Sequence, residues 1–143
     1  MTRVILDDHL LRDLLADDVP QELSAVLHKH DPATTNSYLY RLSRSVVAAR
    51  GGALTGGWSV EQRRALGSQL VALPADVEVL PMRVIAYRMA EIAAEYRISA
   101  LGAECVAASE ALDAPVVVWA GDDGPSIRAA MTTLGRSYRT IQR

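Results

Sequence analysis

The chain has 143 residues, a formal net charge of −2 and a hydrophobic fraction of 50%. These values indicate one globular domain with a single core, and they exclude a disordered chain and the global positive field of many nucleic-acid binders. The single cysteine, Cys105, excludes an internal disulfide and a thiolate metal cluster and is typical of a reducing compartment.

The longest apolar runs are far shorter than the roughly 20 residues that span a bilayer. The N-terminus also lacks the apolar segment of a signal peptide. We therefore expect a soluble, cytoplasmic protein with no membrane partner.

Apolar periodicity and turn residues predict strands that alternate with helices. In chain order the predicted elements are a strand at 3–6, a helix at 9–16, a helix from about 18 to 31, a very short strand at 33–35, a helix at 37–49, a loop at 50–58, a helix from 59 to about 73, a strand at 76–80, a helix at 81–96, a helix at 98–112, a strand at 116–119, a helix at 125–134 and a strand at 138–141. Two pairs, Asp18 with Gln21 and Ser59 with Gln62, have the spacing of capping boxes. The loop contains four glycines, and we interpret it as a flap or a plain connector.

This alternation predicts an α/β fold, namely a three-layer α/β/α sandwich of four or five mostly parallel strands that forms one domain over residues 1–143. The unbroken apolar run at 116–119 is typical of a parallel strand covered on both faces. Sites in such sheets lie beyond the carboxyl ends of the strands. We therefore expect any chemistry near the acidic loop at 121–124 and near Asp7 and Asp8, which follow the first strand.

Three segments carry a resemblance to a known family: VILDD at 4–8, the pattern of Thr34, Thr35, Arg41 and Leu42, and ISALGAECVAASEALDAPVVVWAGDD at 98–123. With these segments the chain resembles, over essentially its whole length, a PIN domain of the VapC toxin type. The resemblance implies a metal-dependent endoribonuclease in which about four carboxylates hold Mg²⁺ or Mn²⁺ at the carboxyl end of the sheet.

The resemblance also implies where these carboxylates should stand in this chain. Asp7 occupies the position of the first acid, whereas Tyr40 and Gly102 stand at the positions of the second and the third. The fourth position is displaced by one or two residues, to Asp122 or Asp123. We therefore expect only two or three carboxylates to cluster, which would give a weak and hydrated metal site.

The candidate residues fall into three groups, each with a plainer interpretation. Asp8 and Asp123 could also be helix caps, and Arg41 and Arg44 could also belong to a solvated helix face. Glu104 lies two residues beyond Gly102, so it should face away from the site. The candidates are Asp7, Asp122 and Asp123 for catalysis, Asp7, Asp8 and Asp122 for a metal, and Arg41 and Arg44 for nucleic acid.

Three hypotheses for function follow from this pattern. The first is a PIN-like protein with an eroded metal site that serves as a non-catalytic or weakly active module binding RNA or protein, with no cofactor or only Mg²⁺ or Mn²⁺. The second is an active endoribonuclease that depends on Mg²⁺ or Mn²⁺, such as the toxin of a toxin–antitoxin pair with an antitoxin-like partner. The third is a homodimer that uses the apolar stripe of residues 82–96, although we expect that stripe to pack into the core.

Overall fold

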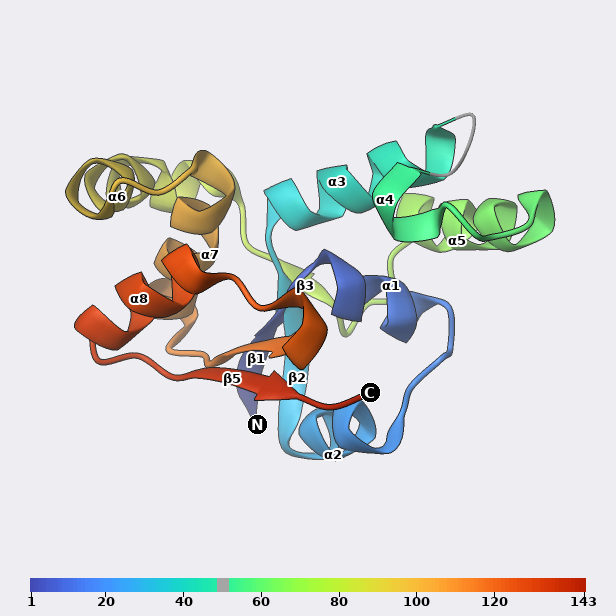
Figure 1. Ribbon diagram of the computed structural model, residues 1–143, viewed down its shortest axis with the longest axis horizontal. Helices are drawn as coiled ribbons and strands as arrows, with labels where there is room; N and C mark the ends of the chain where they lie inside the picture. Colours follow the sequence, from blue (N-terminus) through green and yellow to red (C-terminus); the bar gives the residue numbers. More distant parts are fainter. Residues whose placement is uncertain (49–51) are drawn as a thin grey trace.

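The computed structural model describes residues 1–48 and 52–143. Five strands and the helices between them alternate along the chain, as Figure 1 shows. In chain order they are β1 (Thr2–Leu6), α1 (Asp8–Leu15), α2 (Gln21–Lys29), β2 (His30–Thr34), α3 (Asn36–Val47), α4 (Gly52–Thr55), α5 (Val60–Val71), β3 (Glu78–Val79), α6 (Met82–Tyr96), α7 (Ala100–Leu112), β4 (Val116–Trp119), the 3₁₀ turn η1 (Ala120–Asp122), α8 (Pro125–Thr133) and β5 (Tyr138–Ile141). Among the described residues, no helix combines the length and apolar character needed to cross a membrane.

The five strands form one parallel sheet in the order β3-β2-β1-β4-β5. After β1, the chain places β2 and β3 on one side of this strand and then β4 and β5 on the other side. The order therefore reverses between β1 and β4, where Ile5 pairs with Val116 and Leu6 with Val117. In parallel sheets this reversal leaves a crevice at the carboxyl ends of the strands.

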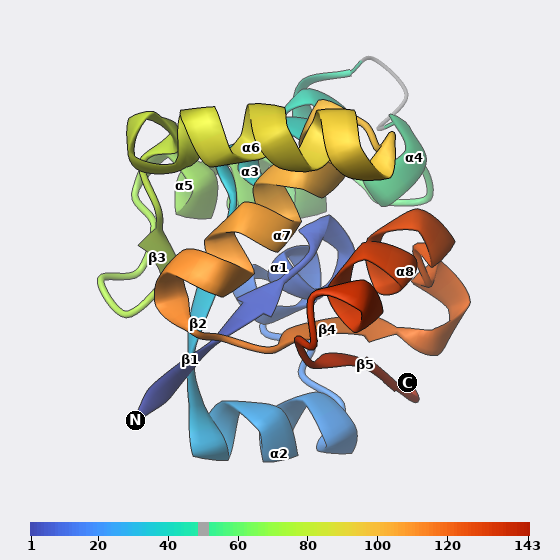
Figure 2. The same cartoon turned by 90° about the vertical axis from the view of Figure 1, so that its left-hand side faces the viewer.

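Helices cover both faces of the sheet, which gives the expected three-layer sandwich. Side chains of β1 alternate between the faces: Ile5 packs with α6, α7 and α8, whereas Val4 and Leu6 pack with α1 and α2. Figure 2 shows α2 below the sheet and α6 and α7 above it. The apolar strand β4 is buried along its whole length, as a doubly covered strand should be.

The helices α3, α4 and α5 form a third packing group with α1. Leu42, Leu54 and Leu66 from these helices bury their side chains against leucines of α1. In Figure 1, α4 and α5 lie on the opposite side of the molecule from α6. Helix α3 contacts both α1 and α7.

One of the two predicted capping boxes is confirmed. The Ser59 hydroxyl accepts a hydrogen bond from the Gln62 N–H at 3.1 Å, and Gln62 Oε1 accepts one from the Ser59 N–H at 2.8 Å. The box predicted for Asp18 is wrong, because α2 starts behind Pro20 without a side-chain cap. The Asp18 carboxylate instead forms an ion pair with Arg143.

The glycine-rich segment is not wholly a loop, so this prediction is wrong for α4. Ser45 Oγ accepts hydrogen bonds from the N–H groups of Leu54 and Thr55, at 3.2 and 3.1 Å, and these contacts hold α4 against α3. The last residue of the helix predicted at 37–49 and the first two of the predicted loop, which together are residues 49–51, lie outside the described residues.

Strand β2 begins earlier than the predicted 33–35 and includes Pro32. Its partner β3 has only two residues and pairs with Ala33 and Thr34 alone. Pro32 therefore lies where the outer side of β2 has no partner strand, a position that tolerates proline. The alternating pattern at 76–80 predicted a longer β3 than the sheet contains.

Candidate functional site

The two aspartates that follow β1 form the start of α1. Asp7 is the N-cap of α1, and its side chain accepts a hydrogen bond from the Leu10 N–H at 2.9 Å. Aspartate suits this position because its carboxylate satisfies a helix N–H that has no partner within the helix. The interpretation of Asp8 as this cap is wrong, since Asp8 is the first helical residue.

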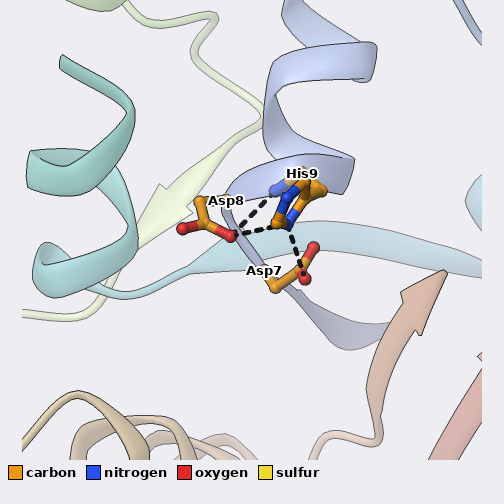
Figure 3. A group of neighbouring side chains, drawn as sticks. All are labelled: Asp7, Asp8 and His9. Atoms are coloured by element: carbon orange, nitrogen blue, oxygen red, sulfur yellow. Dashed lines mark hydrogen bonds and ion pairs between the residues drawn. The ribbon is translucent and has the colours of Figure 1, made fainter. Parts of the chain in front are cut away.

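His9 lies close to three carboxylates at this end of the sheet. His9 Nδ1 lies 3.1 Å from Asp8 Oδ1 and 3.6 Å from Asp7 Oδ2. Figure 3 marks the contacts of the ring with both carboxylates by dashed lines. Its other ring nitrogen, Nε2, lies 3.5 Å from Asp122 Oδ1. One oxygen of Asp7, one oxygen of Asp8 and one ring nitrogen of His9 lie within 4.8 Å of one another. The imidazole therefore bridges the acids that follow β1 and the acid that follows β4.

These residues line a small cavity of about 190 Å³, which we call the acidic pocket. It lies at the carboxyl ends of β1 and β4, where the strand order reverses. Its walls are Asp7, Asp8, His9, Tyr38, Arg41, Leu101, Val118, Asp122, Gly124, Ile127 and Tyr138. The acids thus share the cavity with apolar and aromatic side chains.

The electrostatics of the pocket favour a charged imidazole. The nearby Asp7 and Asp8 carboxylates raise the pKa of His9 to about 10. Burial in turn raises the pKa of Asp7 above its usual value, against the opposing effect of His9. The Arg41 guanidinium lies 3.1 Å from Asp8 Oδ2. Two cations of the chain therefore offset the acids of the pocket.

The structure brings together only some of the predicted site residues. Asp7, Asp8, Asp122 and Arg41 line the pocket, but Asp123 does not. The Asp123 carboxylate accepts a hydrogen bond from the Tyr138 hydroxyl at 2.9 Å and pairs with an arginine of α8. It does not cap α8 either, because the N-cap of that helix is glycine.

Arg44, the other predicted nucleic-acid contact, also lies outside the acidic pocket. It lines a separate hollow beside α4 together with Arg41 and Ser45. Arg41 is thus the member of the predicted pair that reaches the acids.

The two positions where the resemblance implies further acids do not supply a carboxylate. Tyr40 is 66% exposed and lies outside the pocket. Gly102 is buried, and a Cβ atom there would lie 3.2 Å from Ile127 Cγ1. Glu104 points instead at the start of α3, where it accepts hydrogen bonds from the Asn36 and Ser37 N–H groups.

Two side chains have roles that the sequence did not predict. His9 had no visible partner, because Asp122 is distant in the chain and only the adjacent acids hinted at a cluster. Trp119, at the end of β4, lies outside the acidic pocket. Its ring lies on the opposite face of the sheet, and its Nε1–H donates to Asp13 Oδ2 at 2.8 Å.

The donor set fits a divalent cation only in part. The oxygens of Asp7, Asp8 and Asp122 are ligands of the kind that Mg²⁺ and Mn²⁺ prefer. A protonated imidazole has no free electron pair for a metal, and its charge repels a cation. A metal held by the three carboxylates would therefore have to remove the proton from His9 or displace its ring.

No known protein-family model matches this chain, and no curated protein matches it.

Proposed function

We propose that this protein is a PIN-like domain with an eroded metal site, which acts as a non-catalytic or weakly active module that binds RNA or a protein partner. The position of His9 carries the proposal. Its ring lies within 3.6 Å of the Asp7 and Asp8 carboxylates and 3.5 Å from Asp122, so it contacts the same three carboxylates that would hold a metal ion.

The wall of the pocket adds support. Leu101 and Ile127 line the side of the cavity next to Gly102, where the resemblance implies an acid. Apolar carbon cannot replace an oxygen ligand, so a cation here would have fewer protein ligands and more water than in a complete site. The internal cations His9 and Arg41 then serve as counter-ions for the acids at neutral pH.

The protein-binding part of the proposal draws on a second surface, between α3 and α5. A hollow of about 900 Å³ there contains the valines Val46, Val47, Val60 and Val71, of which Val71 is 91% exposed. Exposed apolar patches of this kind are typical of protein contacts. The stripe on α6 is a poorer candidate for a homodimer, since Ile85 lies in the core.

A second candidate function is an endoribonuclease that depends on Mg²⁺ or Mn²⁺, such as a toxin with an antitoxin-like partner. The convergence of Asp7, Asp8 and Asp122 at the strand-order reversal favours it. These three residues would hold the ion, which would activate water and neutralise charge on the phosphate. Arg41, half-exposed at the rim, would contact the RNA backbone.

Calorimetry with Mn²⁺ and cleavage assays on varied RNAs test the proposal. We expect the parent protein to bind Mn²⁺ with a dissociation constant of about 1 mM or weaker at neutral pH, and to cleave RNA slowly or not at all. The Asp7→Asn variant keeps an oxygen that accepts from Leu10 N–H, so it should fold normally. Asp123→Asn, outside the pocket, is the matched control.

Efficient cleavage that requires Mn²⁺ would contradict the proposal. If Asp7→Asn abolishes that cleavage and Asp123→Asn does not, the endoribonuclease is the correct function.

A further inference from the structure

Another hollow, formed by residues of α3, α6 and α7, adjoins the acidic pocket. It has a volume of about 420 Å³, and we call it the Tyr40 hollow. Its lining residues are Asn36, Ser37, Tyr40, Arg41, Met82 and Leu101. Two of them, Arg41 and Leu101, also line the acidic pocket. Arg41 and Leu101 therefore form a wall that the two cavities share.

Buried contacts fix the frame of this hollow. Glu104 of α7 is fully buried, and its carboxylate accepts from the N–H groups of Asn36 and Ser37, both at 2.9 Å. Asn36 also donates its side-chain amide to the Leu80 carbonyl at 2.8 Å, next to the start of α6. The start of α3 is thus tied to both α6 and α7, and Tyr40 follows one turn later.

The side chains inside this frame are only partly used by the fold. Tyr40 is 66% exposed and Met82 39% exposed, so an aromatic ring and an apolar patch face the solvent. Arg41 is half-exposed, and its ion pair with Asp8 involves one terminal nitrogen, Nη1. The guanidinium has five N–H donors, so donors remain for a ligand.

This combination matches a nucleotide. A planar base can stack on an exposed tyrosine and cover apolar side chains, and arginine recognises a phosphate through charge and hydrogen bonds. The volume lies in the range of small-ligand cavities, which is about 300–1,000 Å³. A nucleotide seated in the hollow could therefore place its phosphate beside the Arg41 guanidinium, at the wall shared with the acidic pocket.

We propose that the Tyr40 hollow binds an unpaired base of single-stranded RNA, with Tyr40 stacking on the base and Arg41 contacting the adjoining phosphate. This inference rests on the RNA-binding part of the proposed function. It names the residues that would contact the RNA and adds that the base they bind must be unpaired.

Fluorescence anisotropy with a labelled heptamer of adenylate tests the inference, in EDTA so that metal-dependent cleavage is excluded. Replacing Tyr40 by Ala should weaken binding about 5- to 10-fold, because the stacking surface is lost. Tyr40→Phe keeps the ring and should bind like the parent. Tyr87→Ala is the matched control, since Tyr87 is 81% exposed on α6 and lies outside the hollow.

An abasic ribose-phosphate chain of the same length separates stacking from charge. The parent should prefer the adenylate heptamer over this chain, and Tyr40→Ala should remove that preference. Arg41→Gln should weaken the binding of both chains and reduce the salt dependence, because it removes a phosphate contact.

The outcomes distinguish the inference from the function on which it rests. If the parent and Tyr40→Ala bind the heptamer equally well, the Tyr40 hollow is not the base site, while RNA binding itself stands. If the parent binds neither chain at low salt, both the inference and the RNA-binding part of the proposal are wrong.

Discussion

The buried carboxylate of Glu104 gives the sharpest test of how the fold supports the site. Glu104 Oε2 accepts from the Asn36 N–H and side-chain amide, and Oε1 accepts from the Ser37 N–H, all at 2.9 Å. The Glu104→Gln substitution keeps the shape of the side chain but replaces one oxygen by an NH₂ group. In the better orientation the amide oxygen serves Asn36, and the NH₂ group then faces the Ser37 N–H, donor against donor.

The expected loss of stability follows from these contacts. A buried N–H without an acceptor costs about 1–3 kcal/mol, and the bonds to Asn36 lose the extra strength of a charged acceptor. We therefore expect the free energy of unfolding to fall by about 2–4 kcal/mol, a large part of the roughly 5–15 kcal/mol that stabilises a domain.

Urea unfolding followed by circular dichroism measures this change. The matched control is Glu110→Gln on the same helix, where the carboxylate is partly exposed and pairs with Arg88. We expect this control to lose about 1 kcal/mol or less. A loss below about 0.5 kcal/mol for Glu104→Gln would refute the view that this carboxylate holds the start of α3.

Two further predictions concern the acidic pocket. The pKa of His9 is raised from 6.5 to about 10, so the stabilisation from its protonated ring is complete below pH 6.5 and is lost as the pH rises through 10. His9→Gln should therefore have a lower urea midpoint than the parent near pH 6 but not near pH 11. Equal midpoints of the two proteins at both pH values would show that the ring is not held by the acids. Gly102→Asp alone should destabilise the fold because a Cβ meets Ile127 at 3.2 Å, whereas the double variant with Ile127→Ala should bind Mn²⁺ roughly tenfold more tightly than the parent. Unchanged affinity in calorimetry would mean that position 102 does not face the ion.

Short-range patterns predicted much of the fold. The apolar run at 116–119 indicated a buried parallel strand, and β4 has these bounds and this burial. The capping box at Ser59 was also visible, because both of its hydrogen bonds join residues three apart. In both cases the residues that determine the structure are neighbours in the sequence.

The errors arose where distant contacts decide the structure. Helix α4 forms because Ser45 of α3 accepts hydrogen bonds from Leu54 and Thr55, a contact that glycine content alone does not reveal. The cap of α1 was misplaced by one residue because Asp7 and Asp8 are equally good caps, and only the end of β1 chooses between them.

The candidate site was predictable only in outline. Asp7 lies at the carboxyl end of a strand, as its position after an apolar run suggested. The choice between Asp122 and Asp123 depends on the η1 turn, which directs Asp122 towards His9 and leaves Asp123 beside Tyr138. Such a choice requires the backbone path of the loop, which the acidic and glycine residues alone do not specify.

The pairing of β1 with β4 links the construction of the sheet to its charge balance. This seam consists of the Ile5–Val116 and Leu6–Val117 pairs, and it joins β1, β2 and β3 to β4 and β5. Asp7, Asp8 and His9 arrive from one side of the seam and Asp122 from the other. The pairing of β1 with β4 therefore also brings Asp122 to His9, and a chain in which the seam is open leaves Asp122 without this counter-ion.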